Sequence, residues 1–373
     1  MKGDDKGLHG HRDAFASDYA QARSLFLSAA LEAGATIESL VLPMTGLQGE
    51  ELALDLACVG PSHAERVLVI SSGCHGVEGF CGSGIQVAAL TKGDLARRAE
   101  DAGVSVWLMH ALNPFGFSHL RRVTQENVDL NRNFQDFSHP APENPDYDRV
   151  HDLLLPAEWP PTTDNEQALA DFIDGHGHAT FKAAVSSGQY THPDGMFFGG
   201  RAPTWSRLAL EAALAKRMEL VRNLAWLDIH TGLGPNGVLE RIHTGPAGAG
   251  SFERAKAWWG DEGRMPITST DDGSSSSAPL TGLMVPSLAS LWPHVVWTSL
   301  ALEYGTRPFD DVLQALRADH WLYQHHGVSS DLRAQIRKQL RDAFYVDTEA
   351  WRGQVVTQAL TVFAQGMEGL RRT

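Results

Sequence analysis

Four apolar runs, each ending at polar residues, constrain the fold of this 373-residue chain more than any other feature. They span residues 67–70, 104–109, 224–229 and 295–302. Continuous runs rich in Val, Ile, Leu and Trp are typical of strands that are buried on both faces. Segments with helical periodicity separate these runs. The alternation predicts an α/β/α sandwich, in which helices cover a mixed, mostly parallel sheet.

Further elements are expected on either side of these runs. Residues 14–33 and 85–90 have helical patterns, and residues 52–59 alternate like a strand. Residues 155–163 and 271–279 are rich in Pro, Gly or Ser and are predicted loops, of a kind that often forms lids or binding loops. A C-terminal helix is expected to have one apolar face, formed by Val356, Leu360, Phe363, Met367 and Leu370.

No internal repeat and no domain boundary is evident, so residues 1–373 are predicted to form a single domain. Within it, residues 308–373 are expected to form helices that pack on the sheet.

Composition narrows the classes of partner and compartment. The net charge of −14, without any Lys/Arg block, argues against nucleic acid and anionic membranes as partners. No uncharged run approaches the ~20 residues needed to cross a bilayer, and the polar N-terminal start lacks the apolar segment of a secretory signal. The three cysteines are an odd count without a CxxC pair, which is typical of reduced thiols in the cytoplasm. Oligomeric state is not predicted.

The ends of the apolar runs carry candidate metal ligands. His75 and Glu78 follow the first run, and His230 and Glu303 end two others. Ligand sites of α/β sheets lie at the carboxyl ends of the strands. Two His and one Glu, with a fourth position left to water, form a ligand set that catalytic zinc uses.

We therefore predict one Zn²⁺ ion bound by His75, Glu78 and His230, with Glu303 as the general base. Iron, manganese and cobalt accept the same ligand types, so they remain alternatives. Cys74 is an alternative thiolate ligand, although a small buried residue is the more ordinary role. Without the three ligands, Glu303 would be interpreted as part of a surface salt bridge.

A second dense motif lies at residues 127–134, Asn-Val-Asp-Leu-Asn-Arg-Asn-Phe. Asn131 and Arg132 offer planar donors that suit a carboxylate. Arg122, nine residues before Asn131, is a candidate for stabilising a developing oxyanion. The alternative is that these polar side chains serve turn geometry and helix capping.

Together, the motifs carry a resemblance. His-x-x-Glu, Asp-Leu-Asn-Arg-Asn-Phe, Asp-x-His-Thr and a late strand-borne Glu resemble the zinc carboxypeptidase superfamily, which includes the succinylglutamate desuccinylase and aspartoacylase branch. Residues 72–80 and 188–193 are similar to a bacterial branch of it. The resemblance spans about residues 65–307.

This resemblance implies the superfamily's fold and a metallocarboxypeptidase-like zinc hydrolase. His75, Glu78 and His230 would bind the metal, and Glu303 would activate the water that attacks an amide or peptide bond. Further roles are implied for four polar residues and for a tyrosine. Asp129 would orient His75, Asn131 and Arg132 would hold a free carboxylate, Arg122 would polarise the carbonyl, and Tyr190 or Tyr304 would stand in for a mobile tyrosine.

The substrate class stays open at this point. The Glu-x-Gly at residues 303–305 is closer to the acyl-amino-acid deacylases than to digestive carboxypeptidases, so a small peptide and an N-acyl amino acid are both candidates. His192 is a candidate for lining the substrate pocket. An inactive metal- or ligand-binding module is a further alternative, which the complete set of ligands and base argues against.

Overall fold

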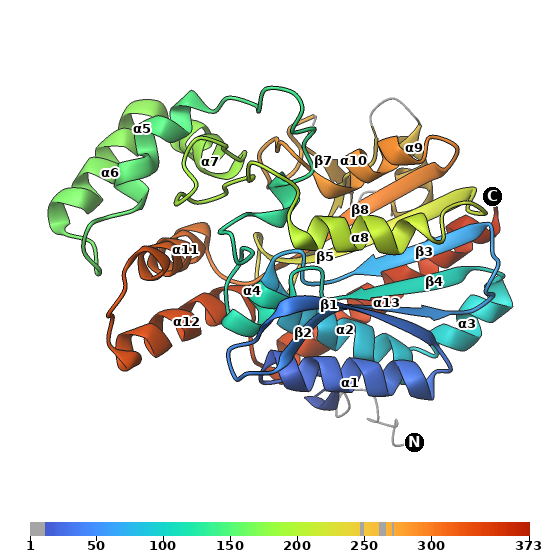
Figure 1. The fold of residues 1–373 in the computed structure, drawn as a ribbon. Coiled ribbons are helices and arrows are strands. Elements are labelled where there is room, and N and C mark those ends of the chain that lie inside the picture. Colours follow the sequence, from blue (N-terminus) through green and yellow to red (C-terminus); the bar gives the residue numbers. More distant parts are fainter. Residues whose placement is uncertain (1–11, 247–249, 261–265, 271) are drawn as a thin grey trace, which may run out of the picture.

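The structure is a computed structural model that describes residues 12–246, 250–260, 266–270 and 272–373. In this part of the chain, eight strands form one sheet in the order β1-β2-β4-β3-β5-β8-β6-β7 (Figure 1). The central strands β4, β3, β5 and β8 are parallel, and antiparallel pairs flank them. This arrangement confirms the predicted mixed sheet. The strands are β1 (Thr36–Thr45), β2 (Glu51–Val59), β3 (Arg66–Ser71), β4 (Ser105–His110), β5 (Asn223–Gly232), β6 (Leu239–His243), β7 (Ile267–Ser269) and β8 (Val296–Gly305).

The four apolar runs form β3, β4, β5 and β8, the parallel centre of the sheet. Side chains alternate between the two faces of each strand. On β5, Leu227 and Ile229 belong to one apolar core, whereas Trp226 belongs to the other. Asp228 and His230 therefore point to the same side as Trp226. His230 lies beside Glu303 in the register of β5 and β8, so two predicted site residues are neighbours at the carboxyl end of the sheet.

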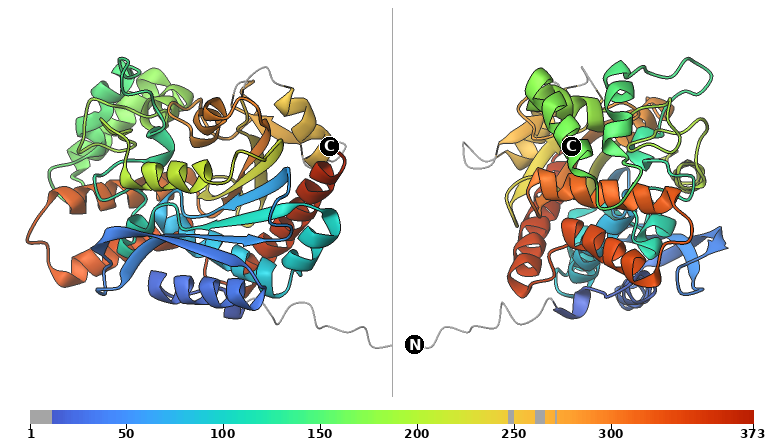
Figure 2. Two further views of the ribbon diagram at one scale, coloured as in Figure 1. Left: turned by 45° about the vertical axis from the view of Figure 1, so that its right-hand side comes forward. Right: turned by 90° about the vertical axis from the view of Figure 1, so that its left-hand side faces the viewer.

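Helices cover both faces of the sheet (Figures 1 and 2). Each set shares an apolar core with the strands beneath it. The 3-10 helices are η1 (Arg12–Ala14), η2 (Gly76–Glu78) and η3 (Leu130–Arg132). One face carries α1 (Tyr19–Glu32), α2 (Gly79–Thr91), α3 (Leu95–Ala102), α9 (Ser251–Trp259) and α13 (Glu349–Arg371); the other carries α8 (Trp205–Ala215) and α10 (Met284–Leu291); α4 (Pro114–His119) lies beside η2.

The C-terminal helix α13 is amphipathic, as its periodicity predicts. Val356, Phe363, Met367 and Leu370 are buried, and Leu360 packs at the edge of the same core. The helix packs on β3 and β5 and on the neighbouring helices α2 and α9. None of the helices in the described ranges is both long and apolar enough to cross a membrane.

A second group of helices lies beyond one end of the sheet (Figure 2). These helices have an apolar core of their own, which includes Val185, Leu316 and Phe344 and also Val77 of η2. We call them the helical cap. They are α5 (Pro145–Leu154), α6 (Thr163–His176), α7 (His178–Ser186), α11 (Phe309–Gln324) and α12 (Ser330–Phe344). Because Val77 lies between His75 and Glu78, the cap packs directly over the predicted metal ligands.

Candidate metal centre

The turn after β3 presents His75 and Glu78 from one tight loop. The loop is fixed from below, because the N–H groups of Gly76 and Val77 donate to the carbonyls of Arg122 and Arg121 at 3.0 and 2.9 Å. Gly76 is required by this close approach. A Cβ at this position would lie 2.1 Å from the carbonyl carbon of Gly116, far inside van der Waals contact. The glycine of His-Gly-x-Glu therefore has a packing role between the two candidate ligands.

Three candidate ligands converge at the carboxyl ends of β3 and β5. His75, Glu78 and His230 each offer one ligand atom, and these atoms lie within 4.8 Å of one another. Nδ1 of His75 lies 2.9 Å from Glu78 Oε1, Nδ1 of His230 lies 3.0 Å from Glu78 Oε2, and the two Nδ1 atoms are 3.2 Å apart. All three side chains are buried. Two imidazoles and a carboxylate form a donor set that suits zinc.

The outer nitrogens of both imidazoles face carboxylates. Nε2 of His75 lies 3.1 Å from Asp129 Oδ1, and Nε2 of His230 lies 2.7 Å from Asp228 Oδ2. A carboxylate in this position favours the proton on Nε2 and leaves the lone pair of Nδ1 for a metal. At His75, Nη2 of Arg122 lies 2.8 Å from the same Nε2, and because a guanidinium only donates, it competes with Asp129 for that nitrogen. The two carboxylates strengthen the fit of this group of residues to a metal ion.

Asp228 is a site residue that sequence reasoning missed. The Asp-x-His motif was visible, but no role was assigned to its aspartate. The available signal is the two-residue spacing, because residues i and i+2 of a strand point to the same face. Asp228 is held in place by Ser71, whose Oγ donates to Asp228 Oδ1 at 2.6 Å.

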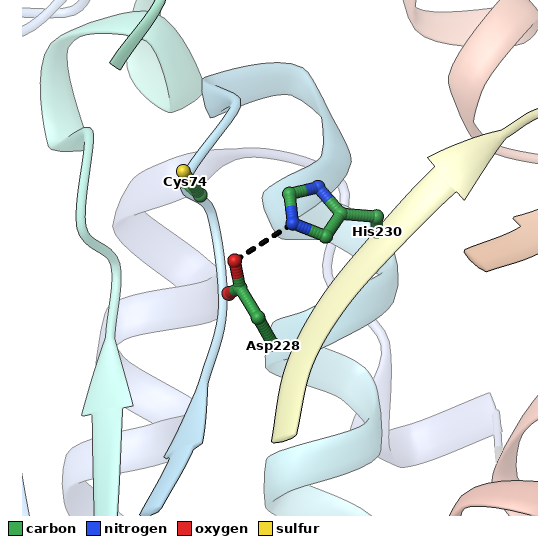
Figure 3. A group of neighbouring side chains, drawn as sticks. All are labelled: Cys74, Asp228 and His230. Atoms are coloured by element: carbon green, nitrogen blue, oxygen red, sulfur yellow. Dashed lines mark hydrogen bonds and ion pairs between the residues drawn. The ribbon is translucent and has the colours of Figure 1, made fainter. Parts of the chain in front are cut away.

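Cys74, Asp228 and His230 form a second possible metal-binding group (Figure 3). In it, His230 would have to use Nε2, the nitrogen that already faces Asp228. Burial and the charge of Asp228 raise the pKa of the Cys74 thiol well above its usual value, which opposes the thiolate form that binds metal. Neither Cys74 nor Asp228 lines the pocket that the other three ligands face. The geometry therefore favours His75, Glu78 and His230, with Cys74 as a buried core residue.

Glu303 faces the same pocket as the three candidate ligands. The backbone N–H of Leu233 donates to Glu303 Oε1 at 2.9 Å, which fixes the carboxyl group at the end of β8. Burial and the charge of Glu78 raise the pKa of Glu303 to about 7. A carboxylate with such a pKa is suited to accept and release protons near neutral pH.

Arg122 lies directly against the ligand cluster. Its guanidinium donates from Nη1 to Glu78 Oε1 and from Nε to Asp129 Oδ2, both at 3.0 Å. The ring of Phe197 lies 5.2 Å from the guanidinium carbon and covers it. Arg122 therefore puts a largely buried positive charge, with 12% of its side chain exposed, at the wall of the pocket beside the metal-binding position.

Asn131 and Arg132 lie in η3 and line the pocket. The Asn131 side chain accepts a hydrogen bond from Met284 N–H at 3.0 Å, at the start of α10. The Arg132 guanidinium donates to the carbonyls of Ser186 and Asn131, through Nη2 and Nη1 at 2.7 and 2.9 Å. Each Nη carries two N–H groups, so these bonds position the guanidinium without using all its donors.

The helical cap supplies one largely apolar part of the remaining pocket wall, and strands and loops outside the cap supply the rest. Lys182 of α7 also lines the pocket, and its ammonium contacts the carbonyl of Ser276. The apolar lining residues include Val185, Phe309, Val312, Leu313, Leu316 and Phe344.

The two tyrosine candidates lie elsewhere. Tyr304 follows Glu303 on β8 and therefore points to the opposite face, where it is buried in the core beneath α13. The Tyr190 hydroxyl donates to the carbonyl of Arg132 at 2.6 Å and thus supports η3 from behind the pocket. His192 does not line the pocket either, because its ring stacks on His151 of α5. The proposals that Tyr304 acts at the site and that His192 lines it were therefore wrong.

Sequence comparison places this chain in a family. Residues 15–358 match the family described as "Protein of unknown function (DUF2817)". The chain belongs to this family. No curated protein matches the sequence of this DUF2817 member.

Solved structures confirm the fold of this DUF2817 protein. Bovine thrombin-activatable fibrinolysis inhibitor, in complex with tick carboxypeptidase inhibitor, is similar with a TM-score of 0.51 and 11% identity, over 96% of this chain and 98% of that one. Another structure of thrombin-activatable fibrinolysis inhibitor is similar with a TM-score of 0.51 and 9% identity, over 95% of this chain and 74% of that one. Carboxypeptidase A from Helicoverpa armigera has a TM-score of 0.43 and 12% identity, over 92% of this chain and 73% of that one. At these identities, the two matches with a TM-score of 0.51 show a shared fold and nothing beyond the fold.

Proposed function

We propose that this protein is a metal-dependent hydrolase of the metallopeptidase type, which cleaves an amide or peptide bond next to a free carboxylate. The observation that carries the proposal is the convergence of His75, Glu78 and His230 in one buried pocket that Glu303 also faces. A chance cluster of polar side chains would not be expected to place a carboxylate behind each imidazole as well.

His75, Glu78 and His230 would hold one Zn²⁺ ion, which when bound lowers the pKa of water and polarises a carbonyl oxygen. Glu303 accepts a proton from the attacking water and passes it to the leaving nitrogen, because its carboxyl group is fixed and has a pKa suited to both transfers. Arg122 stabilises the negative charge that develops on the carbonyl oxygen.

Asn131 and Arg132 would bind the free carboxylate of the substrate. Bonds to protein carbonyls hold the Arg132 fork at the pocket wall, and its remaining N–H groups can pair with a carboxylate. The apolar wall formed by the cap would contact the uncharged part of the substrate.

The test begins with zinc and Glu303. Metal-depleted protein is expected to lose hydrolysis and to regain it with Zn²⁺. Glu303→Gln should keep zinc and fold while kcat falls by roughly 10² or more, the usual scale for loss of a general base. Glu240→Gln is the matched control, because Glu240 lies opposite Glu303 on the neighbouring strand and does not line the pocket. Near-full turnover by the Glu303 variant would contradict the proposal.

A panel of substrates distinguishes a peptidase from an N-acyl amino acid deacylase and from an inactive binding module. It contains dipeptides, longer peptides and N-acyl amino acids, each as the free acid and as the C-terminal amide. Free acids should be preferred by about 10- to 100-fold in kcat/KM, the worth of a hydrogen bond to a charged group. Preference for N-acyl amino acids over peptides would identify a deacylase. Zinc binding without turnover of any compound would instead indicate a binding module.

A further inference from the structure

A second cluster of possible metal ligands lies outside the catalytic pocket. His151 of α5 and two residues of the loop between α7 and α8, His192 and Asp194, offer ligand atoms that lie within 4.8 Å of one another. The rings of His151 and His192 are stacked, with centroids 3.9 Å apart and planes inclined by 22°. Nε2 of His151 lies 4.0 Å from Asp194 Oδ1. None of the three residues lines the pocket of His75 and Glu303.

Buried polar side chains hold the loop that carries His192 in place. The Gln189 side chain accepts from the N–H of His192 at 2.8 Å and donates to the His192 carbonyl at 2.7 Å. The Asn127 amide donates to the carbonyls of Pro193 and Gly195 at 3.1 and 3.0 Å. The cluster is therefore shaped before any ligand binds, which lowers the cost of ordering it.

The cluster also has the second layer of contacts that metal sites use. Asp148 lies one helical turn before His151, and its Oδ1 is 2.8 Å from Nε2 of His192. Among the described residues, the buried Nδ1 of His151 has no hydrogen-bond partner. A buried imidazole nitrogen without a partner is unusual and calls for a ligand or another explanation.

We propose that His151, His192 and Asp194 form a second metal site, which binds a divalent transition ion such as Zn²⁺, with Asp148 completing or orienting the ligand set. Two imidazoles and a carboxylate are the donors that zinc and its neighbours prefer, whereas Ca²⁺ and Mg²⁺ prefer oxygen alone. This assignment also gives a role to the Gly-Gln-Tyr-Thr-His-Pro motif at residues 188–193, which the catalytic pocket leaves unused.

An ion at this site would link the helical cap to a loop that supports the catalytic pocket. It would join α5 to the loop that contains Tyr190 and Phe197. Tyr190 hydrogen-bonds to the Arg132 carbonyl, and Phe197 covers the guanidinium of Arg122. The second ion is thus expected to stabilise the folded protein by mass action.

Zinc stoichiometry of the full-length protein tests the proposal. After equilibrium dialysis against Zn²⁺, the wild type should hold two ions per chain, His192→Ala one, His230→Ala one and the double variant none. Zn²⁺ should raise the Tm of His230→Ala but not that of the double variant. His139→Ala is the matched control, because His139 pairs with Asp136 at 2.9 Å on an exposed loop and, among the described residues, belongs to no group of three possible ligands.

The variants separate the two sites. If His192→Ala holds as many zinc ions as the wild type, the second site is refuted. If His230→Ala holds as many as the wild type, the catalytic assignment fails and the second site stands. Asp194→Asn gives an independent check, since Asp194 is largely exposed and its substitution should spare the fold. It should weaken the binding that Zn²⁺ retains in His230→Ala, and unchanged binding would overturn the proposal.

Discussion

Asp228→Asn should weaken zinc binding at the catalytic pocket without changing a proposed ligand. Asp228 faces Nε2 of His230 at 2.7 Å and is itself fixed by Ser71, whose Oγ donates to its other oxygen. Ser71 Oγ in turn accepts from Trp226 Nε1 at 2.8 Å. With the Ser71 bond kept, the asparagine NH₂ would face Nε2 and force the His230 proton onto Nδ1. With the amide reversed, the charge-assisted bond is lost.

The first arrangement disfavours the tautomer that leaves Nδ1 free for a metal, and the second supports that tautomer only with a weaker, neutral hydrogen bond and loses the bond from Ser71. Removal of such an outer carboxylate typically weakens metal binding by about 10- to 100-fold, which corresponds to about 1.4–2.7 kcal/mol. The affinity can be measured by competition with a chromophoric chelator, in the His192→Ala background so that a single site is titrated. Circular dichroism checks that the variant is folded.

Cys74→Ala is the discriminating control for this experiment. If the ion sits among His75, Glu78 and His230, this substitution should leave the zinc affinity within about twofold, because Cys74 contributes only packing. If the ion instead sits among Cys74, Asp228 and His230, both substitutions remove a ligand. Equal losses in Cys74→Ala and Asp228→Asn, or no loss in Asp228→Asn, would refute the reasoning.

Three further predictions follow from the same structure. Gly76→Ala should lower both stability and zinc content, because its Cβ would clash with the backbone of Gly116; a normal zinc content would contradict this packing role. Arg132→Lys should reduce the preference for free acids over amides by about tenfold, measured as kcat/KM, because an ammonium cannot form the two-pronged bond; an unchanged preference would exclude the clamp. Burial lowers the pKa of His110 to about 4, so the unfolded chain binds more protons between pH 6.5 and 4 and stability falls as the pH falls. His110→Phe keeps the stacking on Phe26. Between pH 7 and pH 5, its free energy of unfolding, measured by urea titration, should fall by about 2 kcal/mol less than that of the wild type. An equal fall in the two proteins would exclude His110 as a source of the pH dependence.

The centre of the sheet could be predicted because its strands are buried on both faces. The runs at 67–70, 104–109, 224–229 and 295–302 are apolar without a break, and they form β3, β4, β5 and β8. The edge strands gave no such signal. β1 is mostly exposed or half-buried, with no regular alternation, and β7 has three residues. A prediction from sequence depends on the pattern of apolar residues, and this pattern is weakest in an edge strand, which pairs with another strand on one side only.

The candidate ligands could be predicted for a related reason. His75 follows β3, and His230 and Glu303 lie near the ends of β5 and β8; the carboxyl ends of parallel strands meet at one edge. The surrounding contacts could not be predicted. Asp129 was assigned by resemblance, and the structure places it beside His75, 54 positions away in sequence. For Asp228, the two-residue spacing places its side chain on the same face as His230, but the contact with Nε2 also depends on the rotamer of His230, which the spacing does not give.

Two different parts of the fold form the pocket: the residues proposed for catalysis lie at the edge of the sheet, and many of those that would contact the substrate lie in the helical cap. The sheet edge supplies the candidate ligands and Glu303, on strands whose register fixes them to one another. The cap supplies a large apolar part of the wall, including Leu313 and Leu316 of α11. Apolar residues on an amphipathic helix look alike in sequence whether they pack in a core or face a ligand. This is the physical reason why the sequence predicts the reaction class more readily than the substrate, since the cap can change the shape of its wall while the sheet edge keeps the ligands in place.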